Sequence, residues 1–227
     1  MVSMPVRDPS LDHLLTPKNS ALILIDYQPP QIYTTRSMNT GRMINNVIAL
    51  TRLGKSFGLP IILTTVNVGT GVNPDTIPQL RNEIPDLPSY DRTQINAWED
   101  TEFVEAVKAT GRRKLLMAAL WTEACLLFPT MDALSEGYEV YPVVDALGGT
   151  TIEAHKASLQ RMYQAGAQAT TWNSVACELQ RDWARKETVE NFLQTVIDQS
   201  EDWGWYEELR GAGERYTAPV PVGAGAR

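Results

Sequence analysis

Short apolar runs that end in polar or turn-forming residues alternate with helical patterns along most of the chain. The first is Ala21–Ile25, which ends at Asp26, and similar runs cover 60–66 and 114–120. Continuous apolar runs of this length are typical of strands that are buried on both faces. Weaker extended segments at 89–92, 138–144 and 167–172 bring the prediction to six strands.

Helical patterns fill the intervals between these runs. Apolar residues recur at helical spacing over 42–57, and Gly58 follows in the position that commonly ends a helix. Pro29-Pro30 predicts that no helix continues directly from the first strand. Further helices are predicted over 77–83, 101–110 with Asp100 as its cap, 124–136, 151–165, 174–186 and 187–199.

This alternation predicts an α/β fold with a doubly wound, six-stranded parallel sheet and helices on both faces. Residues 1–200 read as a single domain, in which 1–20 form a polar surface arm. Residues 201–227 are rich in Gly, Ala and Pro towards their end. They are interpreted as a C-terminal tail, or alternatively as an arm that contacts a neighbouring subunit.

Composition narrows the class of protein. The 227 residues include 27 acidic and 20 basic side chains, so the net charge of -7 argues against a nucleic-acid surface. No apolar run approaches the roughly 20 residues that span a bilayer, so no membrane association is expected. The first ten residues lack the apolar stretch of a secretory signal, and a cytoplasmic location is expected.

Cys125 follows the predicted strand 114–120 after the turn Trp121-Thr122-Glu123, at the predicted start of a helix. The partial positive charge of a helix N-terminus favours the thiolate, which is the nucleophilic form. The carboxyl edge of an open α/β sheet is also where ligands bind. The alternative is a small buried hydrophobic side chain. The other cysteine, Cys177, lies inside a predicted helix and is expected to be buried and structural.

Candidate partners for this thiol come from other strand ends. Asp26 would lie at the same sheet edge, either as a base or as a cap of the following turn. Asp145 also ends a strand, and a turn role is favoured for it. Arg92, by its position alone, reads as a surface arginine. The two histidines, His13 and His155, lie in the arm and at a helix start, so a carboxylate is favoured as the base for Cys125.

Several segments resemble the isochorismatase-like, or cysteine hydrolase, superfamily. The segments that resemble the superfamily as a whole are 21–28 and 120–125. Four further segments resemble its YcaC-like subgroup: 95–98, 164–168, 175–178 and 181–183. The resemblance covers roughly residues 18–200 and implies a Rossmann-like three-layer fold. It implies that Asp26 is the general acid/base, that Cys125 is the nucleophile, and that Arg92 stands at the position of the superfamily's lysine.

The resemblance also implies an oxyanion hole formed by the backbone N–H groups of Trp121 and Cys125, with a cis peptide bond at Leu120–Trp121. The substrate pocket is assigned to Gln28, Trp98, Trp121 and Thr122, although the tryptophans could equally serve the core or subunit contacts. No metal or other cofactor is expected, because no counterpart of the zinc-binding Asp-x-His segment of the superfamily's nicotinamidases lies between residues 60 and 92. A homo-oligomer, tetramer or octamer, is expected.

The function expected from these residues is cysteine-dependent hydrolysis of a small amide or related C–N bond through a thioester intermediate. One alternative is vinyl-ether hydrolysis of the isochorismate type, although true isochorismatases lack the cysteine. The other is a thiol redox sensor or a non-catalytic member of the family, for which an oxidisable Cys125 would suffice.

Overall fold

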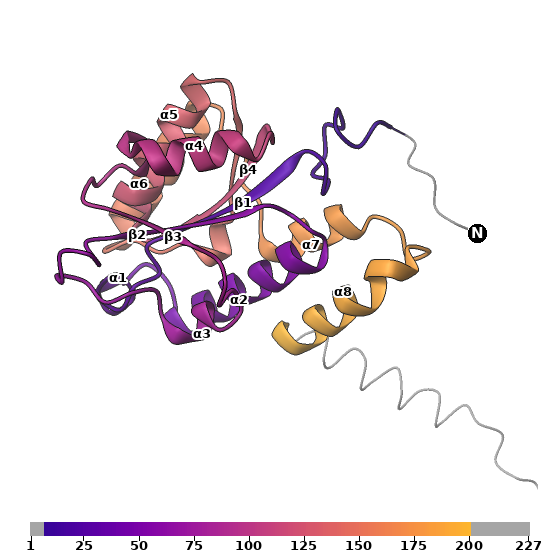
Figure 1. Cartoon of the computed structure of the whole chain (residues 1–227), viewed down its shortest axis with the longest axis horizontal. Helices are drawn as coiled ribbons and strands as arrows, with labels where there is room; N and C mark the ends of the chain where they lie inside the picture. Colours follow the sequence, from indigo (N-terminus) through magenta and orange to yellow (C-terminus); the bar gives the residue numbers. More distant parts are fainter. Residues whose placement is uncertain (1–6, 201–227) are drawn as a thin grey trace, which may run out of the picture.

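One parallel sheet of five strands forms the centre of the computed structural model, which describes residues 7–200 (Figure 1). The strands lie in the order β3-β2-β1-β4-β5. Their bounds are β1 Ser20–Ile25, β2 Ile61–Val66, β3 Ser89–Arg92, β4 Lys114–Ala119 and β5 Glu139–Pro142. The predicted doubly wound α/β class is confirmed, and the predicted tail 201–227 lies outside the described residues.

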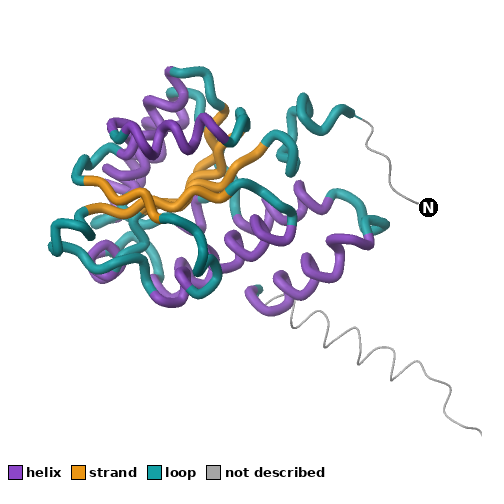
Figure 2. Tube along the Cα trace, viewed as in Figure 1, coloured by secondary structure: helices purple, strands orange, loops and turns teal. Residues whose placement is uncertain are grey.

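Helices cover both faces of the sheet (Figures 1 and 2). One layer holds α4 (Thr101–Ala109), α5 (Leu127–Ser135) and α6 (Ile152–Gln164). On the opposite side lie α1 (Pro29–Thr34), α2 (Thr40–Ser56), α3 (Pro78–Arg81), α7 (Trp172–Gln180) and α8 (Lys186–Gln199). Within residues 7–200, no helix combines the length and the apolar character needed to cross a membrane.

Strand β1 is apolar throughout because its side chains serve two cores. Leu22 and Leu24 point into the core beneath α2, α7 and α8, whereas Ile23 and Ile25 point into the core beneath α4, α5 and α6. All four side chains are fully buried. The continuous apolar run is therefore the pattern of a central strand with helices on both sides.

The sixth strand predicted over 167–172 is wrong in one respect, since only an isolated parallel bridge between Val143 and Thr170 forms there. Gln168 and Thr170 donate their N–H groups to the carbonyls of Val140 and Pro142. Pro142 has no N–H to return, so a hydrogen bond of a regular parallel ladder is missing. The segment follows the sheet edge without becoming a strand.

The prediction that Pro29-Pro30 delays the next helix is also wrong, because α1 begins at Pro29 itself. Proline is well suited to the first helical positions, where its missing N–H would have no helical partner. The turn between β1 and α1 is therefore only three residues long, Asp26 to Gln28.

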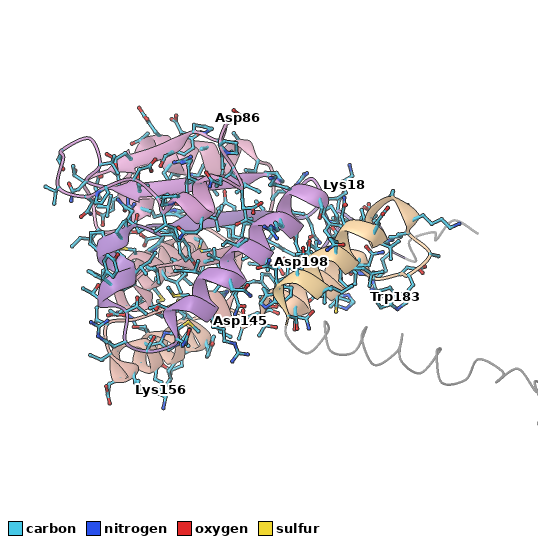
Figure 3. All side chains as sticks on the ribbon, turned by 90° about the horizontal axis from the view of Figure 1, so that it is seen from below. Lys18, Asp86, Asp145, Lys156, Trp183 and Asp198 are labelled. Atoms are coloured by element: carbon cyan, nitrogen blue, oxygen red, sulfur yellow. The ribbon has the colours of Figure 1, made fainter. Side chains whose placement is uncertain are left out.

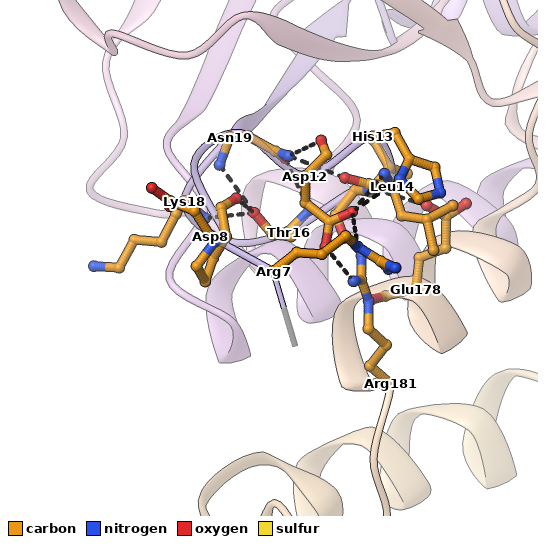
Figure 4. A network of polar contacts seen from close by, with 12 residues as sticks. Arg7, Asp8, Asp12, His13, Leu14, Thr16, Lys18, Asn19, Glu178 and Arg181 are labelled. Carbon is orange, nitrogen blue, oxygen red and sulfur yellow. Dashed lines mark hydrogen bonds and ion pairs between the residues drawn. The ribbon is translucent and has the colours of Figure 1, made fainter. Parts of the chain in front are cut away.

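Residues 7–19 are not a surface arm. Leu15 is fully buried in the core beneath α7, and its N–H donates to Glu178 of that helix at 2.7 Å. Asp12 binds Arg7 at 3.0 Å and Arg181 at 2.5 Å, and Figure 4 shows these contacts as one network. The segment is thus fastened to the end of α7.

Candidate active site

Asp26 and Arg92 form a buried ion pair at the carboxyl edge of the sheet. Nη1 and Nη2 of Arg92 each donate to one carboxylate oxygen of Asp26, both at 2.8 Å, and neither side chain is exposed to solvent. Arg92 ends β3, so its side chain reaches across β2, where it also donates to the Thr65 carbonyl and the Thr64 hydroxyl at 3.0 and 3.1 Å. A two-pronged guanidinium suits this span and geometry.

The backbone at Asp26 is left-handed, with φ at 58°. Non-glycine residues rarely adopt this conformation, and such residues cluster at functional sites. The Asp26 N–H still bonds to the Thr64 carbonyl in register with the sheet, while its own carbonyl accepts from Gln28 at 2.7 Å. The chain therefore turns sharply as the strand ends and leaves the carboxylate at the sheet edge.

Cys125 follows β4, which lies next to β1 in the sheet. The order of the strands reverses direction between these two, since β2 and β3 lie on one side and β5 on the other. Cys125 lies in a π-helical turn, η2 (Thr122–Leu126), that leads into α5. Pro129 lacks the N–H that would bond to the Cys125 carbonyl in an α-helix, which accounts for the irregular start. Single π-helical turns occur often at functional sites. The predicted helix over 124–136 is thus divided into two parts.

The Cys125 thiol is protonated at rest, contrary to the thiolate expected at a helix start. Burial raises its pKa to about 12, and the charge of Asp26 and a hydrogen bond to Asp26 act in the same direction. The charge of Arg92 and the Trp121 N–H oppose this rise but do not overcome it. Only 6% of Cys125 is exposed, so desolvation of the anion outweighs the helix-terminus effect.

Arg92 remains charged in this setting. Burial alone would lower its pKa, but the hydrogen bonds and charge of Asp26, together with Cys125, raise it. The site therefore holds a fixed cation, a carboxylate and a thiol that hydrogen-bonds to that carboxylate. The positions of Asp26 and Cys125 in the sequence predict that they lie at this edge, whereas Arg92 reads by its position as a surface arginine and is added only by the family resemblance. The structure buries Arg92 and brings the three residues together.

The backbone of Trp121 contacts Cys125, and its side chain contacts α1. The peptide bond Leu120–Trp121 is cis, and the Trp121 N–H bonds to the Cys125 sulfur. The indole Nε1 donates to the Gln31 carbonyl and the Thr34 hydroxyl of α1 at 3.0 and 3.1 Å. The ring is therefore held against α1, while the backbone of the same residue contacts Cys125.

Two of the residues assigned to the pocket have structural roles instead. The Gln28 amide is fully buried, accepts from the Val66 N–H and donates to the carbonyls of Val66 and Pro74. It ties the end of β1 to the loop after β2. Trp98 packs edge-to-face against Phe103 and Tyr138, and its indole N–H donates to Glu136. The sequence could not distinguish a structural role from a pocket role for these two residues, because it does not show which groups a buried amide or indole contacts.

Thr122 is fully buried, and its hydroxyl lies 2.8 Å from Nδ1 of His155 in the first turn of α6. The next residue, Glu123, accepts from the backbone N–H and the hydroxyl of Thr150. Sequence reasoning set His155 aside and did not consider Glu123. The sequence spacing could not have indicated the contact between Thr122 and His155, since these residues lie 33 positions apart.

The remaining candidates lie elsewhere. Asp145 lies in the short turn η3 (Val144–Ala146), as favoured, but its carboxylate accepts from the Trp172 N–H at the start of α7. Cys177 lies in α7 as predicted, but its side chain is exposed rather than buried, and both cysteines are free. Trp183 is 61% exposed and stands at the same end of the molecule as Lys18 (Figure 3). Among residues 7–200, no group of three or more His, Cys, Asp or Glu is placed to hold a metal ion.

Comparison with known proteins gives consistent matches over most of the chain. A profile of the isochorismatase domain matches residues 20–174. The curated protein "Probable hydrolase YcaC" of Escherichia coli K12 is 42% identical over 170 residues, which cover 74% of this chain and 81% of that protein.

Solved structures agree with the sequence match. YcaC from Pseudomonas aeruginosa, determined with hexane-2,5-diol and covalent acrylamide, superposes with a TM-score of 0.83 at 36% identity and covers 88% of this chain and 98% of its own. The YcaC gene product from E. coli, described as an octameric hydrolase of unknown specificity, gives a TM-score of 0.82 at 37% identity, with 91% and 98% covered.

Proposed function

The chain belongs to the isochorismatase family of hydrolases, and we propose that it cleaves a small amide or related C–N bond through a thioester on Cys125. The observation that carries this proposal is the buried Asp26–Arg92 pair, joined by two hydrogen bonds of 2.8 Å. The Asp26 carboxylate acts on the Cys125 thiol, because its charge and hydrogen bonding raise the pKa of that thiol. A nucleophile within reach of a base that a third group orients is the arrangement of covalent acyl-transfer catalysts.

The raised pKa of Cys125 fits a nucleophile that is formed only during attack. Asp26 accepts the thiol proton as the sulfur–carbon bond forms, and the N–H groups of Trp121 and Cys125 stabilise the oxyanion. Asp26 then donates that proton to the leaving nitrogen, and the C–N bond breaks. Water attacks the thioester with Asp26 as base, which releases the acid and restores the thiol.

Arg92 has an electrostatic task in this scheme. A guanidinium keeps its proton at any working pH, so it cannot relay protons as a lysine could. It stabilises the charge that moves between Asp26 and Cys125, and it fixes the carboxylate by two hydrogen bonds. All proton transfer therefore falls on Asp26.

The relatives support two parts of the proposal. The P. aeruginosa YcaC structure carries covalent acrylamide. Acrylamide is an electrophile whose double bond accepts thiols, so this adduct supports a nucleophilic cysteine. The E. coli YcaC gene product is described as octameric, and we propose a homo-oligomer, tetramer or octamer, for this chain. Light scattering tests the assembly, and a monomer at micromolar concentration would contradict it.

The alternatives receive less support. Vinyl-ether hydrolysis needs no thiol, which would leave the Cys125–Asp26 contact without a task. Oxidative sensing requires an accessible thiolate, whereas Cys125 is buried and its pKa is raised to about 12.

The test is a screen of small amides, ureides and hydroxamates with the wild type, Cys125→Ala and Asp26→Asn. Any substrate found should lose all turnover in Cys125→Ala, and Asp26→Asn should lower kcat/KM by about 10²–10⁴-fold. Acid quenching during turnover should trap a wild-type acyl adduct, measured by intact-protein mass spectrometry. Unchanged turnover in Cys125→Ala would refute the covalent scheme.

Cys177→Ser is the matched control, because Cys177 is an exposed cysteine outside the site. This variant should keep wild-type kinetics and the acyl adduct. Pyruvate release from isochorismate, measured in parallel, would favour the vinyl-ether alternative. A stable sulfenate on Cys125 without hydrolysis of any amide would favour the sensing role.

A further inference from the structure

A second polar pair lies beside the nucleophile, outside the Asp26–Arg92–Cys125 set. The Thr122 hydroxyl and His155 Nδ1 are 2.8 Å apart, and Thr122 is fully buried. Thr122 opens the η2 turn that carries Cys125, and its own N–H donates to the Gly148 carbonyl at 2.8 Å. The backbone N–H and the side-chain hydroxyl of Thr122 thus both form hydrogen bonds to the segment 148–155.

Glu123 fastens the same turn a second time. Its Oε1 accepts from the Thr150 N–H at 2.8 Å and from the Thr150 hydroxyl at 2.5 Å. Its Oε2 is buried and has no hydrogen-bond partner within the described structure. A Cβ on Gly149 would lie 2.6 Å from this oxygen and 3.0 Å from the His155 Cβ, so the Gly149 backbone packs closely against both Glu123 and His155.

The direction of the Thr122–His155 hydrogen bond depends on where the imidazole carries its proton. With Nδ1 unprotonated, Thr122 donates to it, and the one hydroxyl proton is satisfied. With Nδ1 protonated, the imidazole donates, and the hydroxyl proton must find another acceptor in a fully buried position. Such an unsatisfied donor disfavours the second arrangement.

We propose that His155 is a positioning residue, whose unprotonated Nδ1 accepts from Thr122 and thereby fixes the turn that presents the Trp121 N–H and Cys125. This inference rests on the proposed role of Cys125 as the nucleophile. Within residues 7–200, the side-chain hydrogen bond of His155 goes to Thr122 and not to the Cys125 thiol or Asp26. His155 therefore acts only through Thr122.

The electrostatic surroundings agree with an unprotonated ring near neutral pH. Burial lowers the pKa of His155 below its ordinary value of 6.5, and the charge of Glu123 opposes that shift only in part. The other charged groups on the elements that pack here have partners or face solvent. Asp132 of α5 accepts from Asn96, and Arg36 after α1 donates to the carbonyls of Tyr33 and Thr35. On α6 itself, Glu153, Lys156 and Arg161 are exposed.

Acidification should therefore loosen the turn. A protonated His155 cannot accept from Thr122, and its new charge is attracted to the unpartnered Oε2 of Glu123. The consequence is an acidic limb in Cys125 reactivity that belongs to His155, a residue outside the reacting groups.

The first test reads the proton directly. The chain has two histidines, so His13→Gln leaves His155 as the only imidazole. Its ¹⁵N spectrum near neutral pH should show an unprotonated Nδ1, and Thr122→Val should shift the Nδ1 resonance. A proton on Nδ1 near neutral pH would overturn the proposal.

The second test measures the rate of Cys125 alkylation by iodoacetamide in a Cys177→Ser background, which requires no substrate. The rate ratio of His155→Gln to wild type should be constant above pH 6.5 and rise about 10-fold within roughly one to two pH units below the imidazole pKa. Gln retains an acceptor for Thr122 but does not titrate. His155→Phe, which has no acceptor, should react more slowly than His155→Gln at every pH.

His13→Gln is the matched control, since His13 is exposed and outside the site, and it should follow the wild-type profile. A ratio that does not change with pH for His155→Gln would overturn the proposal. If the spectra and ratios follow expectation while no amide is hydrolysed, the positioning role stands and the proposed hydrolytic function fails.

Discussion

The Arg92 guanidinium contacts both oxygens of Asp26 at 2.8 Å, in a place that solvent does not reach. Two such bonds fix the plane of the carboxylate as well as its position. The carboxylate can therefore meet the Cys125 thiol in one orientation only. A lysine would offer a point charge and leave the carboxylate free to rotate.

Replacement of Arg92 by Lys should lower both stability and activity. Lys keeps the charge but cannot serve both Asp26 oxygens, the Thr64 hydroxyl and the Thr65 carbonyl together. We expect a loss of about 1–3 kcal/mol in the free energy of unfolding, measured by urea denaturation, and a fall of about 10-fold in kcat/KM.

Arg52→Lys is the comparison, because Arg52 pairs with Glu83 at the partly exposed surface. It should change stability by less than about 0.5 kcal/mol. Equal losses in the two variants would show that the two-pronged contact has no special value.

The buried thiol predicts a stability change at alkaline pH. The folded-state pKa of Cys125 is raised from 9.0 to about 12, so the folded protein holds this proton more tightly than the unfolded chain. That stabilisation is complete below pH 9 and is lost as the pH rises towards 12. The loss should approach about 1.4 kcal/mol per pH unit.

Urea denaturation of wild type and Cys125→Ala, compared at the two ends of that range, isolates the thiol because the tyrosines are common to both proteins. The difference in unfolding free energy should shrink or reverse in sign at the alkaline end. A difference that is constant with pH would mean that the thiol titrates normally.

Trp121 should limit the size of the substrate. Trp121→Phe removes the hydrogen bonds to Gln31 and Thr34 but keeps a ring, whereas Trp121→Ala removes the wall. The ratio of kcat/KM for a larger acyl group to that for a smaller one should rise by about 10-fold in Trp121→Ala, and less in Trp121→Phe. Trp183→Phe, at an exposed tryptophan, should leave the ratio unchanged.

Gly148 should tolerate no side chain. A Cβ there would lie 2.5 Å from Thr35 Cγ2 and 3.0 Å from Met43 Sδ, and the Gly148 carbonyl holds the Thr122 N–H. Gly148→Ala should cost about 1–3 kcal/mol and reduce activity. Gly41→Ala, in the first turn of α2, places a Cβ 3.3 Å from the Asn39 Oδ1 that caps the helix, so it should cost clearly less than Gly148→Ala. Thermal unfolding followed by circular dichroism measures both.

Asp12 should stabilise the protein except in acid. Burial alone would raise its pKa, but the Leu14 N–H and the side chains of Arg181 and Arg7 lower it well below 3.8. Its contribution is therefore present above pH 3.8 and is lost as the pH falls further. Asp12→Asn should lower Tm by several degrees near neutral pH, and the difference should narrow in acid. The same Tm difference at both pH values would contradict this.

The sequence predicted five of the strands and two of the candidate site residues because both follow local rules. Asp26 and Cys125 come directly after apolar runs, and parallel strands bring their carboxyl ends to one edge. The role of Arg92 required the family resemblance, since its contact with Asp26 crosses an intervening strand.

What sequence reasoning missed depends on tertiary contacts. His155 meets Thr122 only because α6 packs against η2. The Gln28 amide likewise bonds to Val66 and to the loop after β2. The sixth strand was predicted wrongly because Pro142 has no N–H to donate to it. Pro142 is visible in the sequence, but the sequence does not show that the segment 167–172 would be the neighbour that needs this N–H. Leu15 was obscured by the polar residues around it.

The link between Leu15 and Glu178 joins positions 163 residues apart, and that between Asp12 and Arg181 joins positions 169 apart. The lead into the central strand is therefore synthesised well before its partners on α7 and is secured only after they have been made. Such non-local contacts slow folding. On the ribosome, the core beneath α7 stays open until α7 itself has emerged, which makes this the interval when chaperones would matter most.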